Sequence, residues 1–194
     1  METKKMAQST GGLDGVVVAD TRLSEVDGER GRLIIAGHDI EALIGRVSFE
    51  ELVALLATGA LPDAAGREAT RAALAEGRSA AFARLPTLGD ALSRADGMDA
   101  LRAALAHLPA AEGFGSAARL AGAMAVYAAA WARTRAGLAP VAPDPALSHA
   151  ADYLRMIQGE APGEARTAAL DAYLATVSDH GMNASTFAAR VVTS

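Results

Sequence analysis

The sequence predicts a mostly α-helical protein with one short β-hairpin near its amino terminus. Alanine makes up about a quarter of the 194 residues, whereas aromatic residues supply only 4%. This composition favours closely packed helices. Clusters of β-branched residues gather in the first forty positions, and beyond them apolar residues recur mainly at helical spacing.

The hairpin is predicted from two apolar clusters that flank a turn signal in the segment 13–40. The clusters are Val16-Val17-Val18 and Leu33-Ile34-Ile35, and Asp27-Gly28 lies between them. Glycine tolerates the positive φ that hairpin turns require. We therefore expect a small hairpin or a pair of short strands, with His38 at the surface or in a turn just past the second strand.

Helix boundaries are marked by capping residues and by proline. Ser48 and Glu51 have the spacing of a capping box, which predicts a helix that ends near Gly59, before Pro62. Leucine and aromatic residues at helical spacing predict further helices. These cover residues 101–108, 120–136, 153–159 and 170–177.

The carboxy-terminal segment is predicted to be a helix that is cut short. Asn183 is a suitable N-cap for a helix over residues 184–194, with Phe187, Val191 and Val192 on its apolar side. The helix has no stop signal and no following element that would cover this side. We therefore expect a truncated chain; a short, frayed terminal helix is the alternative.

Composition excludes several classes of function. The chain has 18 Lys and Arg against 23 Asp and Glu, a net charge of −5, whereas nucleic-acid surfaces normally need clustered positive charge. The absence of cysteine excludes disulfides, thiolate zinc sites, iron–sulfur clusters and cysteine nucleophiles. No two histidines have the spacing of helical metal ligands, so we expect neither a metal nor a cofactor.

Neither a membrane segment nor an export signal is expected. Residues 1–10 carry Lys4 and Lys5 without an apolar stretch behind them, so they do not form a secretory signal. The most apolar stretch, 120–132, is shorter than the roughly 20 residues that a bilayer span requires. We expect a soluble, cytoplasmic chain with a flexible tail over residues 1–10.

A glycine-rich segment at 113–118 has the G-x-G-x-x-A spacing of a dinucleotide-binding fingerprint. That site requires a preceding strand and an acidic residue about 20 positions further on. Here residues 104–111 have a helical pattern, and Arg135 stands where the acid should be. The segment is better interpreted as a flexible connection between two helices.

Of the four histidines, His180 has the most informative position. It lies with Gly181 between two predicted helices, beside the start of the second. The N-terminus of a helix carries partial positive charge and free amides, which suits a carboxylate ligand. On spacing alone, a capping or core role is commoner for such a histidine. His107 is expected to complement a helix dipole, and His149 has no evident task.

Two long stretches resemble the citrate synthase family. Residues 12–51 are similar to the family's amino-terminal hairpin and first helix, with His38 in place of a more usual tyrosine. Residues 178–190 are similar to its first histidine motif, and this match is long and specific. Residues 97–102 give a weaker match in the correct order. The resemblance implies that residues 11–194 are the amino-terminal part of a large helical domain, and that the chain is a homodimer.

The resemblance also implies a role for one site residue: His180 corresponds to a histidine that helps to hold oxaloacetate, and we expect it to be catalytic. Asn183 is expected to bind substrate as well, because its amide lies with those of the next residues at the start of the predicted helix. Many relatives carry another histidine where Val177 stands here. The family's second histidine motif, its His-Arg motif, its catalytic aspartate, its substrate-clamping arginines and its small domain have no counterpart.

The expected function is that of the amino-terminal part of a citrate synthase-like acyltransferase. Such an enzyme condenses acetyl-CoA, or propionyl-CoA, with oxaloacetate and releases citrate, or 2-methylcitrate, and CoA. The reaction needs a base, an enol-stabilising donor and closure over the substrates. We expect the chain alone to be inactive. The alternatives are one half of a split synthase, completed by a second chain, and a non-catalytic remnant that binds a partner or a dicarboxylate.

Small residues around the apolar stripe from Leu120 to Trp131 support the expected homodimer. A helix that is apolar on every side must be covered on every side. Burial within the chain's own core is the competing explanation. The small residues concerned are Ala121, Gly122, Ala125, Ala128 and Ala129.

Overall fold

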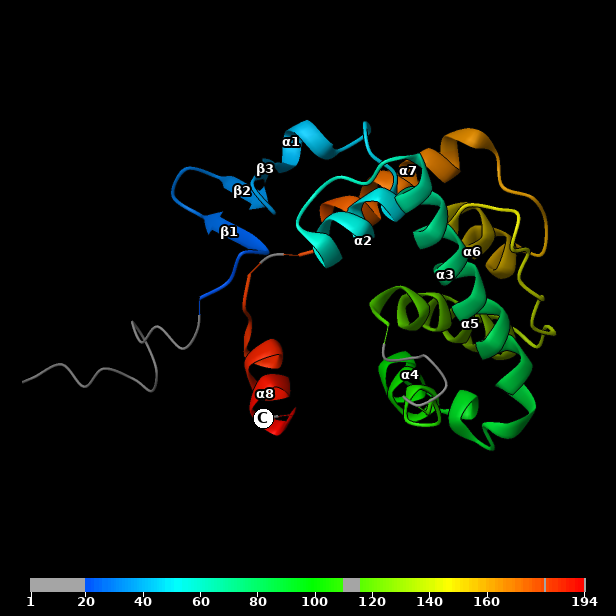
Figure 1. The fold of residues 1–194 in the computed structure, drawn as a ribbon. Coiled ribbons are helices and arrows are strands. Elements are labelled where there is room, and N and C mark those ends of the chain that lie inside the picture. The colour runs from blue at the N-terminus through cyan, green and yellow to red at the C-terminus, as the bar shows by residue number, and fades with distance from the viewer. Residues whose placement is uncertain (1–19, 110–115, 180, 194) are drawn as a thin grey trace, which may run out of the picture.

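The protein is mostly helical, as predicted, with a small antiparallel sheet at one end (Figure 1). The computed structural model describes residues 20–109, 116–179 and 181–193. The strands are β1 (Ser24–Asp27), β2 (Arg32–Ile35) and β3 (His38–Asp39). The helices are α1 (Ile40–Leu43), α2 (Phe49–Thr58), α3 (Ala64–Arg84), η1 (Leu85–Thr87), η2 (Ala91–Ser93), α4 (Gly97–Leu105), α5 (Ala117–Arg135), α6 (His149–Gln158), α7 (Glu164–Thr176) and α8 (Ala184–Thr193).

The predicted hairpin is confirmed around its turn. β1 pairs with β2 in antiparallel register, with Ser24 opposite Ile35 and Asp27 opposite Arg32. The valine cluster at 16–18, which was expected to contribute a strand, lies outside the described residues. The hairpin therefore rests on the strands nearest the Asp27-Gly28 turn.

A third strand corrects the expectation for His38. Ala36 and Gly37 both have positive φ, 46° and 85°, and form a two-residue turn that folds the chain straight back. His38 consequently pairs with Ile35 in β3, where it is half-buried. It is a strand residue and not part of a surface turn.

The predicted capping box of α2 and the predicted helix ends near Gly59 and Gly159 are confirmed. The Ser48 hydroxyl accepts a hydrogen bond from the Glu51 amide at 3.2 Å, and the Glu51 carboxylate accepts one from the Ser48 amide at 2.8 Å. Helices α2 and α6 end at Gly59 and Gly159, both in the left-handed conformation. The Gly59 and Gly159 amides donate to the carbonyls of Leu55 and Arg155, so every partner lies within four residues and the signals are readable from sequence.

The long helix α3 is not one of the individually predicted helices. It begins at Asp63, whose carboxylate caps the Gly66 amide at 2.8 Å, and it runs for 21 residues. Its buried face includes Gly77 and Arg78, so it shows no regular apolar stripe.

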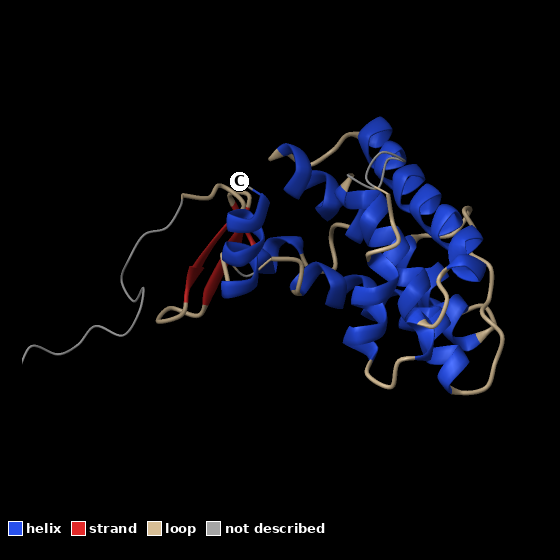
Figure 2. Cartoon of the chain, turned by 90° about the horizontal axis from the view of Figure 1, so that it is seen from below, coloured by secondary structure: helices blue, strands red, loops and turns tan. Residues whose placement is uncertain are grey.

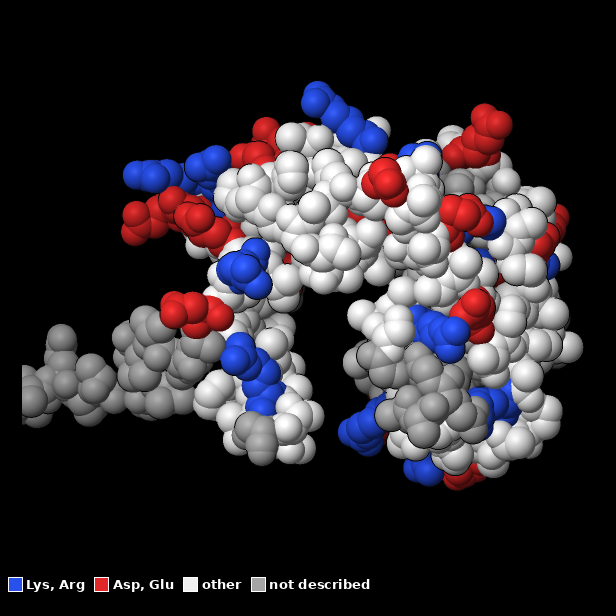
Figure 3. Space-filling model, in the orientation of Figure 1, with Lys and Arg blue, Asp and Glu red and all other residues white. Residues whose placement is uncertain are grey.

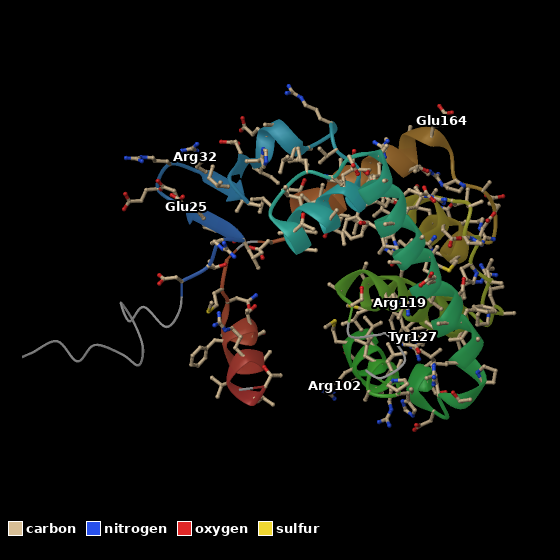
Figure 4. All side chains as sticks on the ribbon, in the orientation of Figure 1. Glu25, Arg32, Arg102, Arg119, Tyr127 and Glu164 are labelled. Atoms are coloured by element: carbon tan, nitrogen blue, oxygen red, sulfur yellow. The ribbon has the colours of Figure 1, made fainter. Side chains whose placement is uncertain are left out.

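The pair α3 and α5 forms the centre of the helical body and packs at backbone contact. A Cβ at Gly77 would lie 2.1 Å from the Arg119 carbonyl oxygen, and one at Gly122 would lie 2.2 Å from that of Leu74. Only glycine permits this approach, because its hydrogen leaves room for the opposite backbone. Tyr127 of α5 is fully buried within this body (Figure 4).

The burial of α5 differs from the predicted stripe. Tyr127 faces the core, but Leu120 and Met124 are 37% and 41% exposed. The face toward the core is formed largely by small residues, including Gly122 and Ala125, because α3 lies directly against them. Some of the small residues of α5 are therefore buried in the core of the chain itself.

The core has two parts, one in the helical body and one beside the sheet. The first is formed by η2 and α3 to α6, with Leu88, Val126, Tyr127 and Met156 among its buried residues. The second joins the sheet, α1, α2 and α7 through Ile35, Leu43, Leu52, Leu55 and Ala175.

Helix α8 lies beside the sheet, away from the helical body (Figures 1 and 2). No residue described in α8 is buried. Figure 3 shows an open recess with α8 on one side and α4 and α5 on the other. Glu25 of β1 and Arg32 of β2 are labelled on the sheet, at the left of the view (Figure 4). Within the described ranges, no helix has both the length and the apolar character that a membrane span needs.

Candidate functional site

The predicted histidine motif connects α7 to α8. His180 itself lies outside the described residues, but both of its neighbours are described. The Asp179 carboxylate accepts a hydrogen bond from the Gly181 amide at 2.8 Å, and the same oxygen accepts one from the Ser24 hydroxyl of β1. Gly181 has a φ of +89°, a backbone conformation that glycine adopts readily.

Asn183 is the N-cap of α8, as predicted. Its side-chain oxygen accepts a hydrogen bond from the Thr186 amide at 2.8 Å, and its carbonyl accepts one from the Phe187 amide at 3.0 Å. The amides of Ala184 and Ser185 donate to no described residue. Asn183 is exposed, and its side-chain nitrogen is a further donor. The start of α8 therefore presents several donors together with the positive end of the helix dipole.

His107 and His38 lie away from the histidine motif in sequence and belong to other elements. His107 follows α4 and its Nδ1 donates to the Ala103 carbonyl at 2.8 Å, as expected for a cation-forming side chain near a helix end. His38 belongs to β3. The glycine-rich segment of 113–118 follows the helix α4, and its residues 113–115 lie outside the described residues. The described part that precedes it contains no strand after β3, so the geometry of a dinucleotide fingerprint is absent there.

His149 belongs to a buried polar cluster that sequence reasoning did not identify. The guanidinium Nε of Arg78 lies 2.7 Å from Asp152 Oδ2, and neither side chain is exposed. Arg78 Nη1 lies 3.2 Å from His149 Nδ1, and Arg78 Nη2 donates to the Leu147 carbonyl at 3.3 Å. The His149 amide donates to the buried Glu50 carboxylate at 2.7 Å.

The environment of His149 keeps its ring neutral. Burial, and secondly the positive charge of Arg78, lower the pKa of His149 to about 3. Because Arg78 is always a donor, Nδ1 accepts and the proton resides on Nε2. The ring also packs 5.0 Å from that of Phe49.

This cluster has a structural role, because its groups are already paired with one another. Asp152 also accepts hydrogen bonds from the Asp144 amide at 3.0 Å and from Arg155 at 2.9 Å. The cluster thereby joins α2, α3 and α6 to the loop before α6. The sequence signal that could have indicated this cluster is Arg78, a charged residue within an alanine-rich helix. Across the described ranges, no three His, Asp or Glu side chains are grouped as metal ligands.

An open apolar groove lies between α4, α5, α6 and α7, with a volume of about 440 Å³. Its lining residues include Phe49, Leu101, Met124, Tyr153 and Tyr173. Tyr173 is 60% exposed. Burial raises the pKa of Tyr153, so this phenol stays neutral. The groove offers apolar contact surface with few charged groups.

Comparison with known proteins gives one consistent family. The family model described as "Citrate synthase, C-terminal domain" matches residues 12–194. The citrate synthase of Haloferax volcanii is 36% identical over 94% of this chain and 52% of its own length. The 2-methylcitrate synthase of Mycobacterium tuberculosis is 34% identical over 94% of this chain and 49% of its own. The chain thus spans about half the length of these curated relatives.

Solved structures show the same relationship. The citrate synthase of Pyrobaculum aerophilum superposes with a TM-score of 0.76 at 29% identity, over 99% of this chain and 54% of that one. The citrate synthase of Thermoplasma acidophilum was solved as a ternary complex with carboxymethyl coenzyme A and oxaloacetate. It superposes with a TM-score of 0.71 at 25% identity, over 89% of this chain and 48% of that one.

Proposed function

Because the chain belongs to the citrate synthase family, we propose that it forms the amino-terminal part of an acyltransferase that condenses acetyl-CoA or propionyl-CoA with oxaloacetate. The products are citrate or 2-methylcitrate and CoA. The relatives include both citrate synthases and a 2-methylcitrate synthase, so both acyl substrates belong to the proposal.

The observation that carries this proposal is the motif of residues 178–190 at the start of a capped helix. Asn183 caps α8, and the amides of Ala184 and Ser185 donate to no described residue. Together with His180 and the helix dipole, these donors suit a dicarboxylate. A relative with the same fold binds oxaloacetate, as its solved complex states.

In the proposed site, His180 donates a hydrogen bond to the keto or carboxylate oxygen of oxaloacetate. Such a bond polarises the keto group for attack by the carbon nucleophile. Asn183 binds the substrate through its side-chain nitrogen, since its oxygen caps the helix. His180 and Asn183 do not supply the base that removes the methyl proton of the acyl-CoA. They also do not supply the donor that stabilises the enol.

A second candidate is a partner-binding helical subunit, either completing a split synthase or acting without catalysis. The observation that favours it is the exposed apolar side of α8, where Phe187, Val191 and Val192 are 36%, 57% and 86% exposed. The recess beside this helix would receive the carboxy-terminal half of a synthase. We further propose a homodimer in which the exposed Leu120 and Met124 of α5 contribute to the interface.

Coenzyme A release tests the proposal. The chain is assayed alone and with the carboxy-terminal half of the Haloferax volcanii enzyme, using oxaloacetate with acetyl-CoA or propionyl-CoA. We expect turnover only when both halves are present. Turnover by the chain alone would overturn the proposal that this chain supplies only part of the active site. Association of the halves without turnover would favour the partner-binding candidate, and fusing the halves controls for weak association.

A further inference from the structure

A carboxylate next to His180 joins two parts of the chain that are far apart in sequence. Asp179 Oδ1 accepts the Ser24 hydroxyl of β1, which is 155 residues away, and the Gly181 amide at 2.8 Å. Val26 of β1 lies close as well, with its Cγ2 3.5 Å from the place where a Cβ of Gly181 would lie. The amino-terminal hairpin is therefore in contact with the histidine motif.

The bond between Asp179 and Gly181 spans the site residue in sequence. The carboxylate of Asp179 thus constrains the backbone at Gly181, just before α8. The constraint is needed because Gly181, at a φ of +89°, has many accessible conformations. Ser24 in turn orients the carboxylate, and it does so from a strand held by backbone pairing with Ile35.

Asp179 is unsuited to contact an anionic substrate itself. A carboxylate within about 4–6 Å of a dicarboxylate is repelled by it, unless donors satisfy both. The Asp179 oxygen that faces the motif already accepts two hydrogen bonds. Any effect of Asp179 on substrate therefore passes through the groups that it orients.

We propose that Asp179 is a positioning residue, and that the Ser24–Asp179–Gly181 bridge lets the amino-terminal hairpin set how the start of α8 meets a carboxylate substrate. This inference rests on the proposed function for its substrate. It adds a role for β1 and names two residues, Ser24 and Asp179, that act on oxaloacetate affinity without touching the ligand.

The first measurement tests the bridge in the chain itself. Amide hydrogen exchange at Gly181, followed by NMR, is compared for Ser24→Ala, Asp179→Ala and Ser24→Thr. Asp179→Ala removes the charged acceptor of the Gly181 amide and should speed exchange about tenfold or more. Ser24→Ala removes the group that orients this acceptor and should also speed exchange, by a smaller factor. Ser24→Thr keeps the hydroxyl and should restore slow exchange. Ser178→Ala is the control, because the buried Ser178 hydroxyl has no partner among the described residues.

The second measurement tests the consequence for substrate, in the chain joined to the carboxy-terminal half of the Haloferax volcanii enzyme. Ser24→Ala and Asp179→Ala should raise KM for oxaloacetate about tenfold, with KM for acetyl-CoA unchanged. Ser24→Thr should restore the value, and Ser178→Ala should not alter it. A purely structural bridge would change both KM values together or neither, and either result would overturn the inference.

The two measurements separate the possible failures. Unchanged Gly181 exchange in both alanine variants would show that the bridge does not hold the motif, which overturns the inference whatever the activity. Protected Gly181 exchange without oxaloacetate turnover in the unsubstituted assembly would overturn the proposed function, and with it the role of the bridge at the site.

Discussion

Arg78 and Asp152 form an ion pair at 2.7 Å in which neither side chain is exposed to solvent. The pair joins α3 to α6. His149 and the Leu147 carbonyl occupy the other nitrogens of the guanidinium. Since charges that lose their partner in the interior are strongly unfavourable, this pair should be one of the most sensitive points of the fold.

Replacing one member of the pair should be far more harmful than replacing both. Asp152→Leu leaves the buried Arg78 guanidinium without its ion-pair partner, and we expect a loss of about 3–5 kcal/mol in the free energy of unfolding. The double variant Arg78→Met with Asp152→Leu should recover a large part of it. Urea denaturation measures both. Arg102→Met is the control, because its pair with Asp99 is exposed and should contribute less than about 1 kcal/mol.

Alanine at Gly77 or Gly122 should disrupt the α3–α5 contact. The added Cβ would lie 2.1 or 2.2 Å from a backbone oxygen, which can move only if the helices separate. We expect a loss of at least about 2 kcal/mol for each, measured by thermal unfolding. Gly28→Ala is the control, because nothing lies within 4 Å of the added atom. Equal stability of all three variants would contradict the close packing.

Acid should destabilise the protein through His149. Its pKa is about 3 in the folded chain, against 6.5 for a histidine side chain in water, so between these values only the unfolded chain takes up the proton. Its contribution is therefore fully present above pH 6.5 and is lost as the pH falls toward 3. The loss at pH 5 is about 2 kcal/mol.

The variant His149→Gln tests this dependence, because glutamine does not titrate. Urea denaturation between pH 5 and 7 should show a shallower decrease in stability for the variant, whatever its stability at pH 7. Parallel curves for the two proteins would indicate that His149 is protonated while folded.

His180→Ala should weaken oxaloacetate binding by roughly ten- to a hundredfold, the effect of one charge-assisted hydrogen bond. Calorimetric titration of the chain joined to the carboxy-terminal half measures this affinity. His107→Ala is the matched control, since the His107 ring bonds to the Ala103 carbonyl at the end of its own helix. Equal affinity with and without His180 would remove this residue from the site.

The proposed homodimer should depend on the exposed edge of α5. Sedimentation at tens of micromolar, roughly the range in which weak dimers are populated, should give a dimer for the native chain. Met124→Lys places a charge on this 41% exposed position and should give a monomer. A folded, monomeric native chain at this concentration would refute the homodimer.

The sequence by itself determined the features that depend on neighbouring residues. Ser48 with Glu51, Gly59, Gly159 and Asn183 each mark a helix end within a few positions, so local chemistry suffices to find them. The Asp27-Gly28 turn and the family resemblance are likewise readable along the chain.

The tertiary structure alone decided which surfaces meet. Leu120 and Met124 have the spacing of a core stripe, yet they are exposed, because α3 packs on the glycine and alanine side of α5. Whether a side chain is buried depends on which other helix or strand packs against it. The spacing of apolar residues along one helix does not indicate which element that is.

The same reason explains the polar contacts that sequence reasoning missed. Arg78 meets His149 across 71 residues, and Ser24 meets Asp179 across 155. No spacing rule connects such positions, since a hydrogen bond between them exists only after the helices and the hairpin have packed. The sequence supplied the groups and the local turns, and the packing of the chain decided which of these groups became partners.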